Sequence, residues 1–367
     1  MIEQLLFWLL IFLGSMYAII HLYLWIGLNR LVNPHSESVE QPISVIVAAR
    51  NEEKVIGSLL QSLVDQQYSS EKFEIIIVND RSIDSTASII EKFQKQYRHV
   101  RLITIEENTS DMPHKKNALR TAIEQSQFEI LAFTDADCIV PKNWLREISK
   151  QFMNDVGVVA GYSPYTLNTS NSFLRYEEYK NSLLAASAVE LKNAFMCTGR
   201  NFAYRKKVYE EVNGFETIKH SISGDDDLFL QVVKRKTNWN IRYMISPESY
   251  VRTLPPPSFS QFVNQRTRHV SASKFYSKHI QLAYSVIHLF HLSVIIGFFI
   301  SPLIALIFLM IKLNIDGALI AHGKTIFHEE FSTIEFSRNE LLLVLYSFLI
   351  APLGIIRTFE WKGTSAA

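Results

Sequence analysis

Apolar runs of two different lengths divide this chain. The longer kind appears first, from Leu5 to Leu28, which reads LLFWLLIFLGSMYAIIHLYLWIGL without a charged residue. A helix of that length, rising about 1.5 Å per residue, would cross a hydrocarbon core of about 30 Å. A cleaved signal peptide fits poorly, because Glu3 precedes the run instead of basic residues and no A-x-A site follows. We therefore predict a transmembrane anchor over residues 1–28.

From residue 42 to residue 252 the apolar runs are short and alternate with helix-like segments. Strands are predicted at ISVIVAA (43–49), FEIIIVND (73–80), VRLITI (100–105) and EILAFTDAD (129–137). Helices are predicted within VIGSLLQSLVDQ (55–66), SIDSTASIIEKFQKQY (82–97) and NALRTAIEQS (117–126). Strands that are apolar throughout and alternate with helices indicate an α/β fold with a mainly parallel sheet covered on both faces.

The last third of the chain is amphipathic and then apolar. We predict an interfacial amphipathic segment over 255–279 and a transmembrane region of two or three helices over 280–357. Ser301-Pro302 interrupts the first apolar run, which predicts a helix, a break and a second helix towards Ala321. The run 341–356 is short and contains Pro352 and Gly354, so it either crosses or re-enters, and the side of the C-terminus stays open.

Composition narrows the classes of function. The net charge of +1 gives no global field for nucleic acid, and two cysteines are too few for a disulfide scaffold. Basic residues beside the apolar runs predict that the 42–252 region faces the cytoplasm: Arg30, Arg266, Arg268, Lys274 and Lys278. The apolar runs contain no acidic residue, which argues against a transporter.

Polar clusters end the predicted strands: ARNEE, NDRS and DAD. Ligands of such sheets bind beyond the carboxyl ends of the strands, so chemistry is expected along one edge. Asp135 and Asp137 would share a face if the strand continued, and two carboxylates there suit a divalent cation that also holds a diphosphate. A polar turn is the alternative interpretation.

Further polar residues suit a nucleotide ligand. Asp80 could accept the imide N–H of a uracil base, while Asp84–Thr86 is typical of a helix cap. Lys115 and Lys116 precede a predicted helix, where cations oppose the helix dipole. A phosphate partner would explain them, and a solvated basic surface is the alternative.

Three motifs towards the C-terminus complete the set. Asp225–Asp227 are adjacent acids that raise one another's pKa, which suits a general base, although helix capping also explains them. TGRNFAYRK places Gly199 in a turn. Gln265 and Arg268 share a helix face, where the guanidinium would bind either a diphosphate or lipid headgroups.

In this order the motifs SVIVAARNEE, VNDRSIDST, HKKNAL, FTDAD, TGRN, GDDDL and QRTRH resemble the inverting family 2 glycosyltransferases of GT-A fold. The similarity is to their membrane-embedded branch, which includes cellulose-, hyaluronan- and poly-N-acetylglucosamine-synthase-like and ceramide glucosyltransferase-like enzymes. The resemblance implies Mn²⁺ or Mg²⁺ on Asp135 and Asp137, and Asp226 as catalytic base beside Asp225. It implies a donor site of Ala49, Arg50, Glu52, Asp80, Lys115, Asp135, Gln265 and Arg268, and an acceptor side of Thr198, Gly199, Asn201 and His269.

Two positions depart from the family pattern. Asn79 replaces the first acid of the usual pair, and His269 replaces the tryptophan of Q-x-x-R-W, which lines the acceptor site in the family. The resemblance implies transfer of a sugar from a nucleotide-diphosphate donor, expected to be UDP-linked, to a polysaccharide or lipid acceptor at the cell membrane. Alternatives are a single-sugar glycolipid synthase of ceramide glucosyltransferase type and a nucleotide-sugar-binding protein without catalysis. A Rossmann dehydrogenase is excluded by the lack of G-x-G-x-x-G after the first strand.

Overall fold

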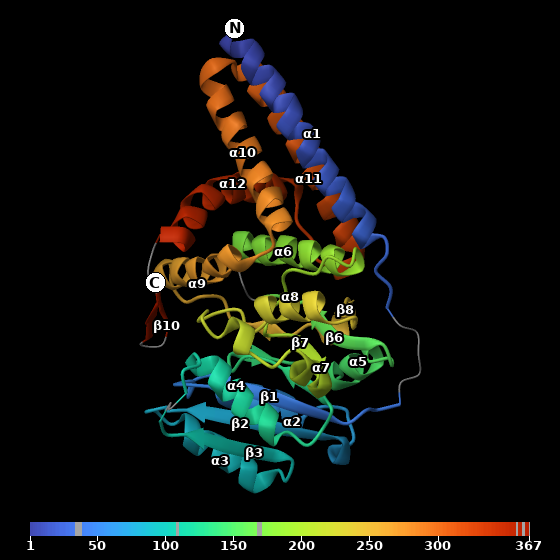
Figure 1. Cartoon of the computed structure of the whole chain (residues 1–367), viewed down its shortest axis with the longest axis vertical. Helices are drawn as coiled ribbons and strands as arrows, with labels where there is room; N and C mark the ends of the chain where they lie inside the picture. The colour runs from blue at the N-terminus through green and yellow to red at the C-terminus, as the bar shows by residue number, and fades with distance from the viewer. Residues whose placement is uncertain (34–38, 108–109, 167–170, 357–358, 362–363, 367) are drawn as a thin grey trace.

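A computed structural model describes residues 1–33, 39–107, 110–166, 171–356, 359–361 and 364–366, with the side chains described up to residue 350. Its centre is a seven-stranded sheet in the order β3-β2-β1-β4-β7-β6-β8 (Figure 1). The strands are β1 Ile43–Ala49, β2 Phe73–Asp80, β3 Val100–Ile105, β4 Ile130–Phe133, β6 Val156–Gly161, β7 Phe202–Arg205 and β8 Asn240–Met244. Neighbouring strands run parallel except at β7, which is antiparallel to β4 and β6. The predicted mainly parallel sheet is confirmed.

The sheet is covered on both faces, as the apolar strands predicted. Ile46, Ile76 and Val78 belong to a core with α4 (His114–Gln125), α6 (Ser172–Glu190) and α8 (Asp227–Lys236). Val45, Val47 and Ile75 belong to a second core with α2 (Ile56–Val64), α3 (Thr86–Gln96) and α5 (Trp144–Gln151). The short helix α7 (Lys206–Glu211) follows β7. Side chains alternate between the faces of a strand, so each strand contributes to both cores.

The fourth predicted strand is shorter than expected. β4 ends at Phe133, and the backbone N–H of Cys138 donates to the carbonyl of Asp135 at 3.2 Å, which turns the chain. Cys138 and Ile139 then form β5, which pairs with β9 (Arg252–Thr253). Asp135 and Asp137 therefore lie on a turn and do not share the face of a strand.

Three apolar helices extend from the sheet domain (Figure 1): α1 (Ile2–Leu28), α10 (Lys278–Ile300) and α11 (Pro302–Phe327). Each is long and apolar enough to cross a membrane, and within the described residues these three alone meet that criterion. They pack through a common apolar core that includes Leu10, Phe290 and Phe308. The predicted break at Ser301-Pro302 is confirmed, since α10 ends and α11 begins there.

The expectation that these runs contain no acid was wrong, because α11 continues to Phe327 and includes Asp316. A buried cluster surrounds this carboxylate. Its members, here called the polar cluster, are Tyr17, His21, Tyr176, Lys180, Lys312, Asp316 and Glu340. Lys180 Nζ lies 3.1 Å from Asp316 Oδ1 and 2.5 Å from Glu340 Oε1. Buried charges need such partners, so the polar cluster ties α1, α6 and α11 to α12 (Thr333–Ile356).

Three helices lie crosswise between the sheet domain and the apolar helices: α6, α9 (Phe259–Ala272) and α12 (Thr333–Ile356) (Figure 1). α12 packs against α9 and α6, and β10 (Phe359–Trp361) and β11 (Thr364–Ala366) form a hairpin after it. Close approach of α1 to α6 requires Gly27, because a Cβ there would lie 2.2 Å from Ser187 Oγ. Sequence reasoning had not assigned α6, whose acids and lysine interrupt its apolar pattern.

Candidate functional site

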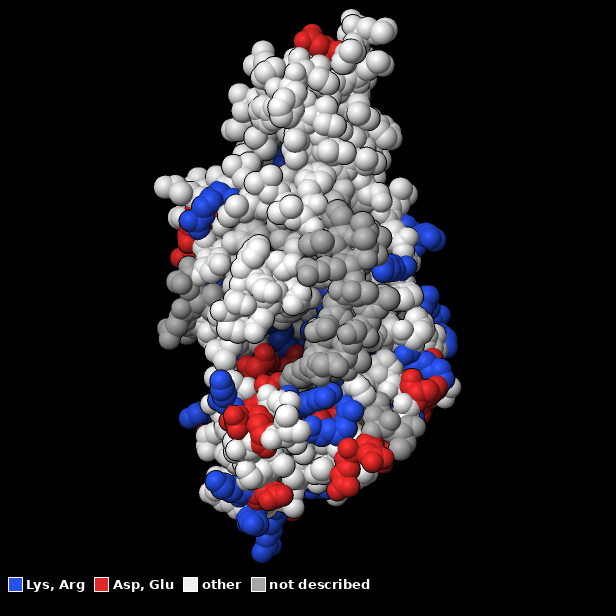
Figure 2. Space-filling view, turned by 90° about the vertical axis from the view of Figure 1, so that its left-hand side faces the viewer, with Lys and Arg blue, Asp and Glu red and all other residues white. Residues whose placement is uncertain are grey.

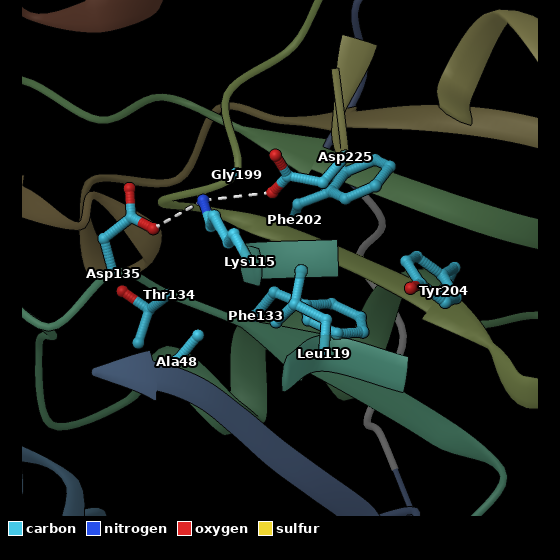
Figure 3. A pocket seen from close by; sticks show the side chains of 10 residues that line it. All are labelled: Ala48, Lys115, Leu119, Phe133, Thr134, Asp135, Gly199, Phe202, Tyr204 and Asp225. Atoms are coloured by element: carbon cyan, nitrogen blue, oxygen red, sulfur yellow. Dashed lines mark hydrogen bonds and ion pairs between the residues drawn. The ribbon is translucent and has the colours of Figure 1, made fainter. Parts of the chain in front are cut away.

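A pocket opens at the carboxyl ends of β1 and β4, where the strand-end clusters predicted chemistry (Figure 3). Its walls come from both halves of the sheet, from α4 and from the segments before β7 and α8. The lining residues are Ala48, Lys115, Leu119, Phe133, Thr134, Asp135, Gly199, Phe202, Tyr204 and Asp225. The pocket therefore brings together residues from five of the sequence motifs.

Lys115 is held between two carboxylates (Figure 3). Its Nζ lies 3.0 Å from Asp135 Oδ1 and 3.0 Å from Asp225 Oδ2. Burial lowers the pKa of Lys115, but Asp135, Asp225 and Asp226 outweigh it and raise the pKa above the ordinary value. The ammonium therefore stays charged. Lys115 lies in the first turn of α4, where the helix dipole disfavours a positive charge. The carboxylates of Asp135 and Asp225 offset this unfavourable interaction.

Lys116, the next residue, faces away from this pair. Its side chain is fully buried, and its Nζ donates to the carbonyls of Ser221 and Ser223, the latter at 2.7 Å. Burial lowers the pKa of Lys116 to about 8. Lys116 fixes the segment that leads to Asp225, so the two adjacent lysines have different roles: one faces the pocket and one supports its wall.

Asp226 is the N-cap of α8 and is fixed through both carboxylate oxygens. Oδ2 accepts from the backbone N–H of Gly199 at 2.7 Å, and Oδ1 accepts from the backbone N–H of Asp227 at 2.7 Å. Burial and the neighbouring Asp225 carboxylate raise the pKa of Asp226, although Lys115 acts in the opposite direction. Asp226 therefore caps α8 and also has the raised pKa that suits a general base, so the base interpretation stays a prediction.

Asp227 completes the acidic motif. Its Oδ2 accepts from the Tyr276 hydroxyl at 2.5 Å. Burial and Asp226 raise the pKa of Asp227 well above the ordinary value. Tyr276 follows α9 and precedes α10, so it connects the acidic motif to the base of the apolar helices. The sequence gave no signal for this tyrosine, because the contact joins positions far apart in the chain.

The residues predicted to bind the nucleotide lie in the loops that follow β1 and β2, and hydrogen bonds join these two loops. The backbone N–H of Glu52 donates to Thr86 Oγ1 at 2.8 Å, and Asp84 accepts from the backbone N–H of Thr86, the first residue of α3, at 3.0 Å, while the N-cap residue Ser85 makes no side-chain cap bond. Asp80 is buried and pairs with Arg81, whose Nε lies 2.8 Å from Asp80 Oδ1. Ala49 is buried at the end of β1, beside Arg50. The sequence did not predict that Arg81 pairs with Asp80, the carboxylate expected to bind the nucleotide base.

Asp135 and Asp137, the predicted metal ligands, lie on one turn after β4. Asp135 borders the pocket and Asp137 is exposed on the same turn. Lys115, Arg200 and Arg268 together outweigh the effect of burial and lower the pKa of Asp135. Two ionised oxygen ligands on an open turn suit a hard divalent cation that takes further ligands from a diphosphate and water. Within the described residues no group of three or more His, Cys, Asp or Glu offers a complete shell.

The residues of the TGRN segment make different contacts. Thr198 Oγ1 accepts from Arg200 Nε at 3.0 Å, and Arg200 Nη2 donates to Glu178 of α6 at 2.7 Å. Arg200 was quoted within the motif but missed as a site residue. It holds the loop whose Gly199 N–H contacts Asp226, so an ion pair to α6 fixes the candidate base indirectly.

Asn201 was expected on the acceptor side, but its side chain lies in the core. It is 0 % exposed, donates to the carbonyls of Tyr162 and Ser249, both at 2.8 Å, and accepts from Trp144 Nε1 at 3.0 Å. Both the amide nitrogen and the amide oxygen of the side chain thus bond to other residues of the protein, so Asn201 has no side-chain group left to bind a substrate. The structure corrects this expectation: Asn201 is a core residue behind the loop.

The QRTRH motif lies on α9. Arg268 is near enough to Asp135 to lower its pKa, whereas His269 is exposed. Gln265 Oε1 is buried without a hydrogen-bond partner among the described residues. Arg266 is only 4 % exposed and pairs with Glu177 of α6. Arg266 is therefore an internal ion-pair partner and cannot count as a basic residue at the lipid headgroups.

Comparisons with known proteins agree with this geometry. The family described as Glycosyl transferase family 2 matches residues 44–212, and Glycosyl transferase family group 2 matches residues 130–353. Glycosyltransferase AglE of Haloferax volcanii is 31 % identical over 50 % of this chain and 58 % of its own. Beta-monoglucosyldiacylglycerol synthase of Synechocystis is 33 % identical over 33 % of this chain and 25 % of its own. The chain thus spans less than two thirds of these relatives.

A solved structure matches over nearly the full length. Mannosyltransferase PcManGT from Pyrobaculum calidifontis, solved in complex with GDP-Man and Mn²⁺, aligns with a TM-score of 0.60 at 19 % identity. The alignment covers 95 % of this chain and 99 % of that one. This likeness shows the fold, a mainly parallel sheet of GT-A type. The sheet, the pocket and the family match over more than half of the chain agree: this protein belongs to the family 2 glycosyltransferases.

Proposed function

We propose that this glycosyltransferase is embedded in a membrane and transfers a sugar, with inversion, from a UDP-linked donor to a hydroxyl of a membrane-associated acceptor. The observation that carries the proposal is the arrangement around Lys115. A half-buried cation lies between Asp135, on the candidate metal turn, and Asp225, next to the candidate base Asp226. This arrangement supports a site in which charges for a diphosphate lie next to a base for a hydroxyl.

In the proposed reaction the acceptor oxygen attacks the anomeric carbon as Asp226 takes the hydroxyl proton. The bond to the nucleoside diphosphate breaks on the opposite face of the sugar, which inverts the configuration. Lys115 and Arg268 stabilise the negative charge that develops on the departing diphosphate. Asp80 accepts an N–H of the base. A cation bound at Asp135 and Asp137, Mn²⁺ or Mg²⁺, would supply further neutralisation of the diphosphate.

The acceptor is proposed to be a membrane lipid or a growing polysaccharide. Single addition to a lipid is favoured by His269, which replaces the aromatic residue that lines the acceptor site in the family, and by the small number of apolar helices. Among the relatives, Beta-monoglucosyldiacylglycerol synthase acts in glycolipid synthesis by its name, and Poly-beta-1,6-N-acetyl-D-glucosamine synthase of Staphylococcus epidermidis in polymer synthesis.

The proposed location is the cell membrane, with the sheet domain in the cytoplasm, where UDP-sugars are made. Charged side chains gather on the sheet domain, and the end formed by the apolar helices is nearly free of them (Figure 2). Arg30, Lys274 and Lys278 are exposed between the two regions, as the positive-inside rule predicts.

The experiment is nucleotide release by the purified protein in detergent. UDP- and GDP-sugars are screened with Mn²⁺ or Mg²⁺, host membrane lipid extract serves as acceptor, and Asp226→Asn is the control. Metal-dependent UDP release that Asp226→Asn abolishes supports the proposal, and the labelled product separates glycolipid from polymer. Folded protein that binds a donor without turning it over would favour the nucleotide-sugar-binding alternative, and folded protein that neither turns over nor binds any donor would contradict the proposal. Turnover that chelation leaves intact would contradict the metal site.

A further inference from the structure

Asp227 is the first residue of α8, and both of its carboxylate oxygens accept hydrogen bonds. Oδ1 accepts from the backbone N–H of Leu228 at 2.7 Å, and Oδ2 accepts from the Tyr276 hydroxyl at 2.5 Å. The bond to Leu228 is local and satisfies an N–H that the start of a helix leaves without a backbone partner. The bond to Tyr276 spans 49 residues of sequence and therefore exists only in the folded chain.

The Tyr276 hydroxyl stabilises a carboxylate that no cation neutralises. Among the described residues Lys115 pairs with Asp225, at the other end of the acidic motif, and no lysine or arginine pairs with Asp227. Burial and the neighbouring Asp226 raise the pKa of Asp227, whereas the hydrogen bond from Tyr276 lowers it. A hydroxyl that donates to a carboxylate makes a stronger bond than one between neutral groups. Tyr276 is therefore the main support of the Asp227 side chain from outside α8.

Tyr276 is itself held in place by the first turn of α10. Gln281 Nε2 donates to the backbone carbonyls of Ser273, Lys274 and Tyr276 at 3.4, 3.1 and 3.0 Å. The Tyr276 ring also packs edge-on against Phe195, with ring centroids 6.0 Å apart. Because the turn and the ring are both fixed, the hydroxyl has a defined position against α8.

A second contact joins the same face of α8 to the start of α10. Gln231, four residues after Asp227 and on the same side of the helix, donates from Nε2 to the Phe195 carbonyl at 2.8 Å. Phe195 packs in turn against Tyr284 of α10, with ring centroids 6.3 Å apart. The position of Asp227 relative to Tyr276 is thus maintained at two points along α8.

Asp227 acts on the candidate base through its backbone. Its N–H donates to Oδ1 of Asp226 at 2.7 Å, while the Gly199 N–H binds the other oxygen, Oδ2. Rotation of Asp227 about its backbone would change the direction of this N–H. The bond between the Asp227 side chain and Tyr276 opposes that rotation, so it also limits the rotation of the Asp226 carboxylate.

We propose that Tyr276 is a positioning residue for sugar transfer: its hydroxyl fixes Asp227, and the fixed Asp227 N–H orients Oδ1 of the candidate base Asp226. This inference rests on the proposed function, in which Asp226 takes the proton of the acceptor. It makes the first turn of α10 a support of the site, although the described lining of the pocket includes no residue of α10.

The test compares kcat with donor affinity in the whole chain. Tyr276→Phe removes the hydroxyl and keeps the ring that packs on Phe195. We expect kcat to fall about 10- to 100-fold, the size expected when a hydrogen bond to a charged group is lost, while the Kd of the donor stays at the parent value. Tyr284→Phe is the matched control. Tyr284 packs on the same ring but makes no hydrogen bond to the acidic motif among the described contacts, so kcat should equal that of the parent.

Two further variants test the route through Asp227. Asp227→Ala removes the acceptor of the Tyr276 hydroxyl, so adding Tyr276→Phe to it should lower kcat no further. Gln281→Met releases the turn that carries Tyr276 and leaves every acid in place. It should lower kcat less than Tyr276→Phe does, and the two changes together should lose no more than Tyr276→Phe alone.

A parent-like kcat in Tyr276→Phe would overturn the proposal, and so would losses in Tyr276→Phe and Asp227→Ala that simply multiply. A loss of donor affinity as large as the loss of kcat would assign Tyr276 to folding alone and would also overturn it. If Tyr276→Phe does not fold, Gln281→Met decides, because a parent-like kcat there contradicts the role of the turn. Absence of transfer by the parent protein with every donor would instead refute the proposed function on which the inference rests, so the two failures are distinguished.

Discussion

The backbone N–H of Gly199 donates a 2.7 Å hydrogen bond to Oδ2 of Asp226, and so joins the TGRN loop to the acidic motif. One oxygen of the candidate base is thereby oriented by a loop that α6 holds through Arg200 and Glu178. The base is positioned from two directions, because its other oxygen caps α8. The predictions below follow from this arrangement.

Replacement of Asp226 by Asn should lower turnover about 10²- to 10⁴-fold, the range that loss of a general base gives. Stability at neutral pH should not fall and is expected to rise. The folded protein raises the pKa of Asp226, so the ionised carboxylate is disfavoured there relative to the unfolded chain. Donor turnover and thermal unfolding measure the two effects. A variant that is both inactive and unfolded would contradict the second expectation, and Asp227→Asn is the matched neighbour that should retain more activity.

The acid limb of the pH–rate profile should lie above the range of an ordinary aspartate. The base must be ionised, so activity is lost as pH falls through its raised pKa, which burial and Asp225 produce. In Asp225→Asn the Coulombic contribution disappears, and the limb should move to lower pH even though turnover falls. The measurement is kcat/KM against pH for both proteins. A limb that stays in place would show that the titrating group is not Asp226.

Replacing Lys115 should mainly affect donor binding, and replacing Lys116 should mainly affect the free energy of unfolding. Lys115→Ala removes a charge from the pocket and should weaken donor binding with little loss of fold. Lys116→Met leaves the carbonyls of Ser221 and Ser223 without their donor and should cost about 1–3 kcal/mol of unfolding free energy. Calorimetric titration with the donor and chemical denaturation assign the effects. The opposite pattern, a folded but non-binding Lys116→Met, would contradict the division of roles.

The ion pair between Glu178 and Arg200 should affect turnover, and the effects of replacing the two residues should be coupled. Glu178→Gln and Arg200→Gln are each expected to lower kcat more than donor affinity, because neither side chain lines the pocket; Arg200→Gln should also weaken donor binding slightly, since Arg200 acts on Asp135. Without its anchor, the Gly199 N–H should hold Asp226 less well, and since that bond lowers the pKa of Asp226, the acid limb should move to higher pH.

A double-mutant cycle checks this pair, with a coupling of about 0.5–3 kcal/mol expected for residues in direct contact. Lys219→Gln, which breaks an exposed ion pair with Asp111, is the control for a surface charge. Additive losses in the double variant would mean that Arg200 and Glu178 act separately. Unchanged pH profiles would assign them a role in folding alone.

The sequence alone predicted that the sheet is mainly parallel, where its first three strands end and the helix break at Ser301-Pro302, because these depend on local periodicity and on proline. It also identified Lys115, Asp135 and Asp225, which strand ends and helix starts place on one edge of a parallel sheet. Only the tertiary structure decided which neighbour faces the pocket: Lys115 or Lys116, and Gly199 or the buried Asn201. It also decided that Arg266 pairs internally with Glu177, and that α12 lies across the apolar helices. Those outcomes depend on contacts between residues distant in sequence, and a buried charge or amide reveals its partner only when the chain has folded around it.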